Sequence, residues 1–155
     1  MIAETEISNQ SSVLIAGISV RTSNQNGKSQ KDIGELWTRL MVENLAEKTS
    51  NQISDDIYCV YTDYESDHTG SYTAVLGYRV STLNDLPDGF TGLSVPEGKY
   101  KIYYLEGKFP DNVGKAWQEI WESRIERIYR ADYDLYQAGA LSFEETKAQI
   151  YLGIR

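Results

Sequence analysis

Hydrophobic residues recur at a spacing of three and four positions in two stretches of the chain, 32–48 and 110–129. This spacing places them on one face of a helix and predicts two amphipathic helices that lie on a core. Pro110 and Asp111 favour a helix start, so we expect the second helix to begin there. The expected inward residues are Ile33, Leu36, Trp37, Leu40, Met41 and Leu45 in the first helix, and Val113, Ala116, Trp117, Ile120, Trp121 and Ile128 in the second.

Short runs of β-branched and aromatic residues, separated by turn residues, predict strands. Residues 1–12 are mostly polar, and we expect a flexible N-terminal segment there. Residues 84–98 are rich in Pro and Gly and are expected to connect two halves of the chain. For 138–146 the pattern leaves a turn and a short helical turn open. The expected strands are 13–20, 57–62, 72–80, 99–106, 133–137 and 147–154.

The two helical stretches are similar to each other in sequence. Residues 33–37 (IGELW) are followed 80 positions later by 113–117 (VGKAW), with Gly and Trp identical. Residues 58–61 (YCVY) likewise correspond to 133–136 (YDLY). A duplicated unit predicts two similar halves with a natural ligand site between them.

The fold class expected from these patterns is α+β. We predict one domain over residues 13–155, built from two pseudo-symmetric strand–helix–strand–strand modules at about 13–82 and 97–155. They would form an antiparallel sheet with two long helices around a central cleft. Because side chains alternate along a strand, Asp134 and Tyr136 share one face, and the repeat puts Cys59 and Tyr61 on the same face. The face of Tyr72 depends on a strand register that the sequence leaves open.

Charge and composition exclude several classes of function. The formal net charge is −8 and no cluster of Lys and Arg is present, which argues against direct binding of nucleic acid. The single cysteine, Cys59, excludes an internal disulfide. The single cysteine, the absence of a signal peptide and the absence of a long apolar stretch together favour a cytoplasmic protein without a membrane segment. His68 is the only histidine, and the acidic stretch 63–74 lacks the glycine and glutamate of a calcium loop, so we expect no metal and no cofactor.

Several short motifs, in order along the chain, resemble one family. They are residues 15–22 (IAGISVRT), 36–37 (LW), 60–73 (VYTDYESDHTGSYT), 76–77 (LG), 96–100 (PEGKY) and 117–120 (WQEI). Together they resemble the gyrase-inhibitor-like small-molecule-binding domain, which is also the effector-binding domain of AraC-type and MerR-type multidrug-responsive transcription regulators. The resemblance covers residues 13–155 in a stand-alone form, without the family's DNA-binding domain. It implies two strand–helix–strand–strand modules around a cleft that binds hydrophobic, often cationic, organic molecules.

An acidic residue lies centrally in that family's cleft, usually Glu in a Phe-Glu-x-Tyr pattern. Here residues 133–136 match the pattern with Asp134, whose carboxylate is one methylene shorter. A carboxylate in an apolar strand is costly to bury unless it is hydrogen-bonded or meets a cation. Asp134 could instead be exposed to solvent at an edge strand, or accept a hydrogen bond from a neighbouring tyrosine hydroxyl. We predict a ligand-binding site with no catalytic residue, formed by Asp134, Trp37, Trp117, Tyr61, Tyr72, Tyr136, Met41 and Trp121.

The predicted function is therefore the binding of hydrophobic, cationic, drug-like molecules in an aromatic cleft. The chain has 12 tyrosines and three tryptophans, which suit either aromatic walls or ordinary core packing. Two alternatives remain: a protein-interaction module that inhibits a DNA-handling enzyme, and a hydrolase of reactive electrophiles in which Asp134 activates water. A regulatory protein partner fits the first function, and we expect a monomer or weak dimer.

Overall fold

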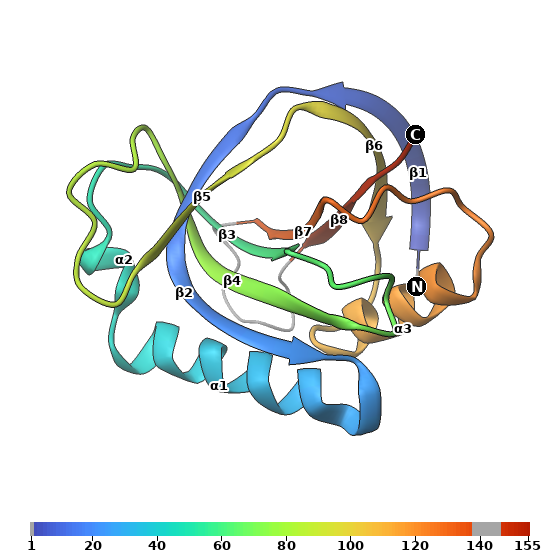
Figure 1. Ribbon diagram of the computed structural model, residues 1–155, viewed down its shortest axis with the longest axis horizontal. Helices are drawn as coiled ribbons and strands as arrows, with labels where there is room; N and C mark the ends of the chain where they lie inside the picture. Colours follow the sequence, from blue (N-terminus) through green and yellow to red (C-terminus); the bar gives the residue numbers. More distant parts are fainter. Residues whose placement is uncertain (1, 138–146) are drawn as a thin grey trace.

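The fold is an eight-stranded sheet that curves into an arc, with helices packed against it (Figure 1). The structure is a computed structural model and describes residues 2–137 and 147–155. The strand order is β1-β6-β8-β7-β3-β4-β2-β5, and each neighbouring pair is antiparallel. The strands are β1 (Ile2–Gln10), β2 (Val13–Ser23), β3 (Gln52–Thr62), β4 (Ser71–Val80), β5 (Thr91–Val95), β6 (Gly98–Leu105), β7 (Ala131–Tyr136) and β8 (Ala148–Gly153).

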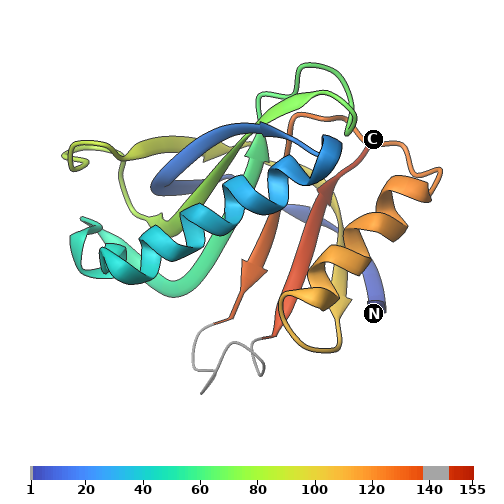
Figure 2. The same ribbon diagram turned by 90° about the horizontal axis from the view of Figure 1, so that it is seen from below.

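Two long helices, α1 (Lys28–Val42) and α3 (Asp111–Glu122), lie on the same face of the sheet. In the view of Figure 2, β7 and β8 pass between them. A 3-10 turn, η1 (Gln25–Gly27), precedes α1, and a short helix, α2 (Leu45–Lys48), follows it. The predicted α+β class, with an antiparallel sheet and two long helices, is confirmed.

The first predicted helix, 32–48, differs from the structure at both ends. α1 begins at Lys28, after Gly27, whose φ of 70° lies in the left-handed region that glycine adopts readily. It ends at Val42, because Asn44 also has a positive φ, 50°, which a right-handed helix cannot contain. The expected single helix is therefore two helices, α1 and α2.

The second predicted helix, 110–129, is too long. α3 ends at Glu122, since Ser123 is extended with a ψ of 164°. Its last predicted inward residue, Ile128, is 36% exposed. The chain after α3 instead turns back along the sheet, where Arg127 forms an isolated antiparallel bridge with Ile154.

Two strands lie where the sequence pattern predicted irregular chain. Residues 2–10, expected to be flexible, form β1 and pair with β6. β5 lies inside the predicted connector 84–98 and pairs with β2. Both are edge strands, paired on one side only. β1 is mostly polar, and β5 is short and lies among Pro and Gly residues, so the hydrophobic pattern did not reveal them. The open question at 138–146 lies outside the described residues.

β3 and β7 form the centre of the sheet. Reading outwards, β4, β2 and β5 follow β3, while β8, β6 and β1 follow β7. In the register of the central pair, Cys59 lies opposite Asp134 and Tyr61 lies opposite Asp132. The two similar segments, 58–61 and 133–136, therefore lie side by side in the middle of the fold.

Each face of the sheet carries its own core. Cys59, Tyr61 and Tyr136 pack on the helix side with Leu36 and Trp117, which confirms the predicted alternation. Tyr72, whose face the sequence left open, also lies on the helix side. The opposite core contains Tyr58, Val60, Tyr133 and Leu135, together with Tyr151, whose ring stacks on that of Tyr133 at 4.5 Å between centroids.

Candidate ligand-binding site

The side chain of Asp134 is fully buried at the centre of β7, on the helix side of the sheet. Its Oδ1 accepts a hydrogen bond from Nε1 of Trp117 at 2.9 Å. Its Oδ2 accepts from the hydroxyls of Tyr61 at 2.5 Å and Tyr136 at 3.0 Å. All these donors are neutral. A carboxylate offers about four lone-pair sites, so roughly one has no donor among the described residues. Within residues 2–137 and 147–155, Asp134 takes part in no ion pair.

Each of the two helix tryptophans packs edge-on against a tyrosine that donates to Asp134. Trp37 of α1 meets Tyr136 of β7 at 5.0 Å between ring centroids and an interplanar angle of 86°. Trp117 of α3 meets Tyr61 of β3 at 5.4 Å and 83°. Such pairs contribute about 0.5–1.5 kcal/mol each beyond the burial of their area. The two helices therefore hold the two tyrosine hydroxyls in place over one carboxylate.

The other predicted site residues differ in their surroundings. Tyr72 is buried against Tyr61, at 5.8 Å between ring centroids, and its hydroxyl donates to Asn24 rather than to Asp134. Trp121 is half-buried and stacks on His68 at 5.9 Å. Met41 is 45% exposed. The structure thus gathers six of the predicted residues around the carboxylate, while Trp121 and Met41 lie nearer the surface. The six are Asp134, Trp37, Trp117, Tyr61, Tyr72 and Tyr136.

A second carboxylate, Asp132, is buried two residues before Asp134. Its Oδ2 accepts from Nη2 of Arg127 at 2.7 Å and from the hydroxyl of Tyr64 at 2.5 Å. Its Oδ1 accepts from the backbone N–H of Gly153 at 2.7 Å. Among the described residues, the helix side therefore holds two buried carboxylates, of which Asp132 is paired with a cation.

The guanidinium of Arg127 lies among aromatic rings. Its central carbon is 4.3 Å from the ring centroid of Tyr129 and 5.6 Å from that of Trp117. The side chain is only 4% exposed, and its Nε and Nη1 have no hydrogen-bond partner within residues 2–137 and 147–155. This corner of the site is therefore a cation held by one carboxylate and by ring faces.

Burial raises the pKa of Asp134 from 3.8 to about 6. The hydrogen bonds from Tyr61, Trp117 and Tyr136 act in the opposite direction, since they stabilise the ionised carboxylate, and the nearby charge of Asp132 raises the pKa further. Burial first, and the charge of Asp134 second, raise the pKa of Tyr61 and Tyr136 well above 10. At neutral pH, Asp134 is thus the ionised group and the two tyrosines remain donors.

The site is closed. We expected a cleft open onto Asp134, but its exposed fraction is 0% and the side chains that bond to it cover it. The expectation of an open cleft is therefore wrong: among the described residues, no opening leads to the carboxylate of Asp134. Trp37, Tyr61 and Phe109 are only half-buried, so the outer side of the aromatic cluster reaches the surface. Phe109 lies 5.3 Å from Trp37 and 5.2 Å from Tyr136 between ring centroids.

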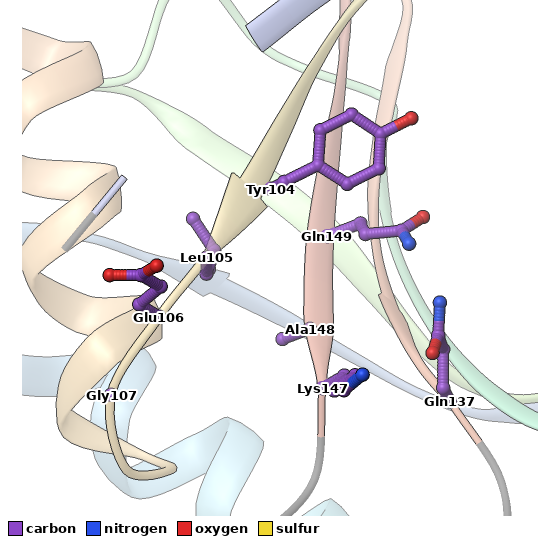
Figure 3. Close-up of a pocket in the computed structure, with 8 residues that line it drawn as sticks. All are labelled: Tyr104, Leu105, Glu106, Gly107, Gln137, Lys147, Ala148 and Gln149. Atoms are coloured by element: carbon purple, nitrogen blue, oxygen red, sulfur yellow. The ribbon is translucent and has the colours of Figure 1, made fainter. Parts of the chain in front are cut away.

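A cavity of about 300 Å³ lies elsewhere, at the ends of β6 and β8 (Figure 3). Its walls include the polar side chains of Glu106, Gln137 and Gln149. None of the predicted site residues lines it, and neither does a buried carboxylate. We therefore place the candidate site at Asp134. The full lining is Tyr104, Leu105, Glu106, Gly107, Gln137, Lys147, Ala148 and Gln149.

Across the described ranges, no three side chains of His, Cys, Asp or Glu gather closely enough to hold a metal ion. No helix of the same residues combines the length and the apolar character needed to cross a bilayer.

Sequence reasoning missed Asp132, Arg127, Tyr64 and Phe109. Asp132 could have been found, because it alternates with Asp134 along the strand and so shares its face. Arg127 gave no local signal, since its place depends on the early end of α3. Tyr64 and Phe109 lie outside the predicted helices and strands, where periodicity carries no information about burial.

Comparison with known proteins identifies the family. YobU, a candidate transcriptional regulator of Bacillus subtilis (strain 168), is 27% identical over 145 residues, which cover 90% of this chain and 91% of YobU. The integron cassette protein VCH_CASS2 of Vibrio cholerae has a similar structure, with a TM-score of 0.79, 24% identity, and coverage of 99% of this chain and 97% of that one. SAV2435, solved bound to tetraphenylphosphonium, has a TM-score of 0.76 and 17% identity, covering 98% of this chain and 94% of its own.

The match to a family extends over almost the whole chain. Residues 6–154 match Cass2, described as integron-associated effector binding protein. The resemblance to an effector-binding domain that the sequence motifs indicated is thereby confirmed. The chain belongs to the Cass2 family of integron-associated effector binding proteins.

Proposed function

We propose that this protein binds hydrophobic organic cations, with the positive charge held against Asp134. The contrast between the two buried carboxylates carries the proposal. Asp132 has an internal cation, Arg127, whereas Asp134 has only neutral donors among the described residues. An ionised carboxylate buried without a cation is costly, and an external cation that reaches it offsets part of that cost.

The aromatic rings around Asp134 supply the rest of the binding energy in this proposal. Tyr61, Tyr136 and Trp117 surround the carboxylate, and each cation–π contact contributes about 0.5–2 kcal/mol. Arg127 supports the idea, since it is a cation already held between Tyr129 and Trp117 in the same region. Ring faces accept many flat shapes, so selection would rest on charge more than on exact form.

Binding requires an opening step, because the carboxylate is covered. Trp37 and Phe109 form the half-buried outer part of the cluster, and we propose that they move aside when the ligand enters. We also propose that 13–82 and 97–155 are pseudo-symmetric modules that meet at this site. The matching strand order outward from β3 and β7 and the crossed pairs of Trp37 with Tyr136 and Trp117 with Tyr61 support this. The free energy of opening lowers the net affinity, which we expect near micromolar.

The relatives support a sensing or sequestering role. The complex of SAV2435 with tetraphenylphosphonium shows that a protein of this fold takes up a lipophilic cation. YobU is a candidate regulator, which supports a role in which ligand occupancy is read by a partner protein. We propose that the chain acts by binding alone, so that a bound ligand is released unchanged.

Calorimetric titration with tetraphenylphosphonium at pH 7.5 tests the proposal. We expect binding by the natural chain, and a loss of about tenfold or more in Asp134→Asn, which keeps the shape of the side chain but removes its charge. Glu122→Gln, at the exposed end of α3, is the matched control, since it removes one negative charge that makes no hydrogen bond to Asp134. Equal affinities for all three chains would contradict the proposal. Consumption of an ester probe over many turnovers, lost in Asp134→Asn, would instead indicate the hydrolase.

A further inference from the structure

Two glycines in the long helices have no explanation in the fold itself. Gly34 of α1 and Gly114 of α3 occupy the same place in the repeat, three residues before a tryptophan. Neither has a positive φ, so the backbone does not require glycine. A Cβ at either position would meet no atom within 4 Å, whereas a Cβ at Gly17 of β2 would lie 2.1 Å from a backbone oxygen. Packing therefore explains Gly17 but neither helix glycine.

Alanine would suit both helix positions better in the free protein. Glycine is a poor helix former because its backbone loses the most freedom on folding. Open space surrounds both positions, so a methyl group would fit without strain. Two matching glycines that weaken their helices and relieve no clash point to something that approaches the helix backbone from outside.

On α1, this approach would occur beside the proposed site. At about 100° per residue, Gly34 lies roughly 60° around the helix from Trp37 and roughly in line with Met41. Trp37 packs against Tyr136, which donates to Asp134, and against Phe109, which precedes α3. The flank of α1 that carries Gly34 therefore borders the site.

On α3, Gly114 lies roughly 60° around the helix from Trp117 and roughly in line with Trp121, as Gly34 does with Trp37 and Met41 on α1. Trp117 donates to Asp134, and Trp121 stacks on His68, whose backbone carbonyl accepts from the side chain of Asn24 just before η1. Gly114 thus lies on the side of α3 that carries Trp121, which faces the loop of His68. Figure 2 shows the two helices over the same face, with the central strand β7 between them.

Building on the proposed function, we propose that Gly34 and Gly114 are the places where the bound cation lies against the helix backbone. With the charge at Asp134, the bulky groups of the ligand occupy the open space over the two glycines. A side chain at either position would take that space. This favours wide cations with several aromatic groups, which reach both helices, over small ammonium ions.

The test replaces the glycines and measures stability and binding in the same chains. Gly34→Ala and Gly114→Ala should each raise the melting temperature by roughly 2–4 °C, because alanine is the better helix former. Affinity for tetraphenylphosphonium should fall by roughly fivefold in the double alanine variant and by more than about tenfold in Gly34→Leu/Gly114→Leu. The control is Glu35→Ala/Lys115→Ala, on the adjacent exposed positions, which leaves the net charge unchanged.

The outcomes separate this inference from the proposed function. The glycine inference is supported if the variants melt at a higher temperature and bind more weakly as the new side chain grows, while the control variant binds like the natural chain. Unchanged affinity in the alanine and leucine variants, with binding still lost in Asp134→Asn, would overturn the glycine inference alone. Failure of the natural chain to bind tetraphenylphosphonium would overturn the proposed function, and this inference with it.

Discussion

Replacing Asp134 with Asn should make the ligand-free protein more stable at neutral pH. Burial raises the pKa of Asp134 from 3.8 to about 6, so the folded state holds the proton more tightly than the unfolded state does. At pH 7, where the group is ionised in both states, that shift corresponds to a cost of about 3 kcal/mol in the free energy of unfolding. Asn carries no charge, and so avoids this cost.

The hydrogen bonds at this position can largely be kept by Asn. Its carbonyl oxygen can still accept from Nε1 of Trp117, and its amide can donate to the hydroxyl oxygens of Tyr61 and Tyr136. The hydroxyl hydrogens of Tyr61 and Tyr136 then lose the carboxylate as their acceptor, which offsets part of the gain. We therefore expect a net increase of about 1–3 kcal/mol in the free energy of unfolding at pH 7.

The pH dependence distinguishes this cause from others. The pKa of Asp134 is higher in the folded state than in the unfolded state. Protonated Asp134 therefore adds to the free energy of unfolding in full below about pH 4, and this contribution is lost as the pH rises through about 6. Urea denaturation of both chains between pH 4 and 7.5 measures the difference, which should shrink to roughly half near pH 5. A variant that is less stable than the natural chain at pH 7, or a difference that does not change with pH, would refute the reasoning.

Three further predictions concern the same cluster. Asp132→Asn leaves the buried guanidinium of Arg127 without its carboxylate and should lower the free energy of unfolding by about 3–5 kcal/mol in urea denaturation; a loss under about 1 kcal/mol would mean that the pair is not structural. Affinity for tetraphenylphosphonium should fall as the pH drops below about 6, approaching tenfold per unit, while Asp134→Asn should bind equally between pH 5 and 8. Trp117→Phe keeps a ring but removes the N–H donor that lowers the pKa of Asp134, so calorimetric titrations should show the midpoint of this pH dependence shifting upward; a midpoint that stays in place would show that the donor is unimportant.

Local pattern was enough to predict the helix side of the sheet. Trp37 and Trp117 were placed by their helical spacing and by the repeat, and both lie in the predicted aromatic surroundings of Asp134. The alternation along β7 put Asp134 and Tyr136 on one face, where the structure has them. These features depend on the periodicity of side chains along helices and strands, which can be read from the sequence alone.

Features set by distant parts of the chain were not predicted. β1 is a polar edge strand whose stability comes from backbone pairing with β6, so its side chains carry little pattern. The pair of Arg127 and Asp132 exists because α3 stops at Glu122 and the next residues turn back to the sheet. Whether the site is open or closed depends on a small balance of packing energies that no spacing of residues encodes.

The most direct test of cation binding at Asp134 compares one cation with a neutral molecule of similar shape. Methyltriphenylphosphonium and triphenylphosphine oxide would each be titrated calorimetrically at pH 7.5 into the natural chain and into Asp134→Asn. We expect the substitution to weaken the phosphonium by about tenfold or more and the oxide by less than about twofold. An equal loss for both compounds would show that Asp134 acts through shape or stability, and would contradict an electrostatic role for its carboxylate.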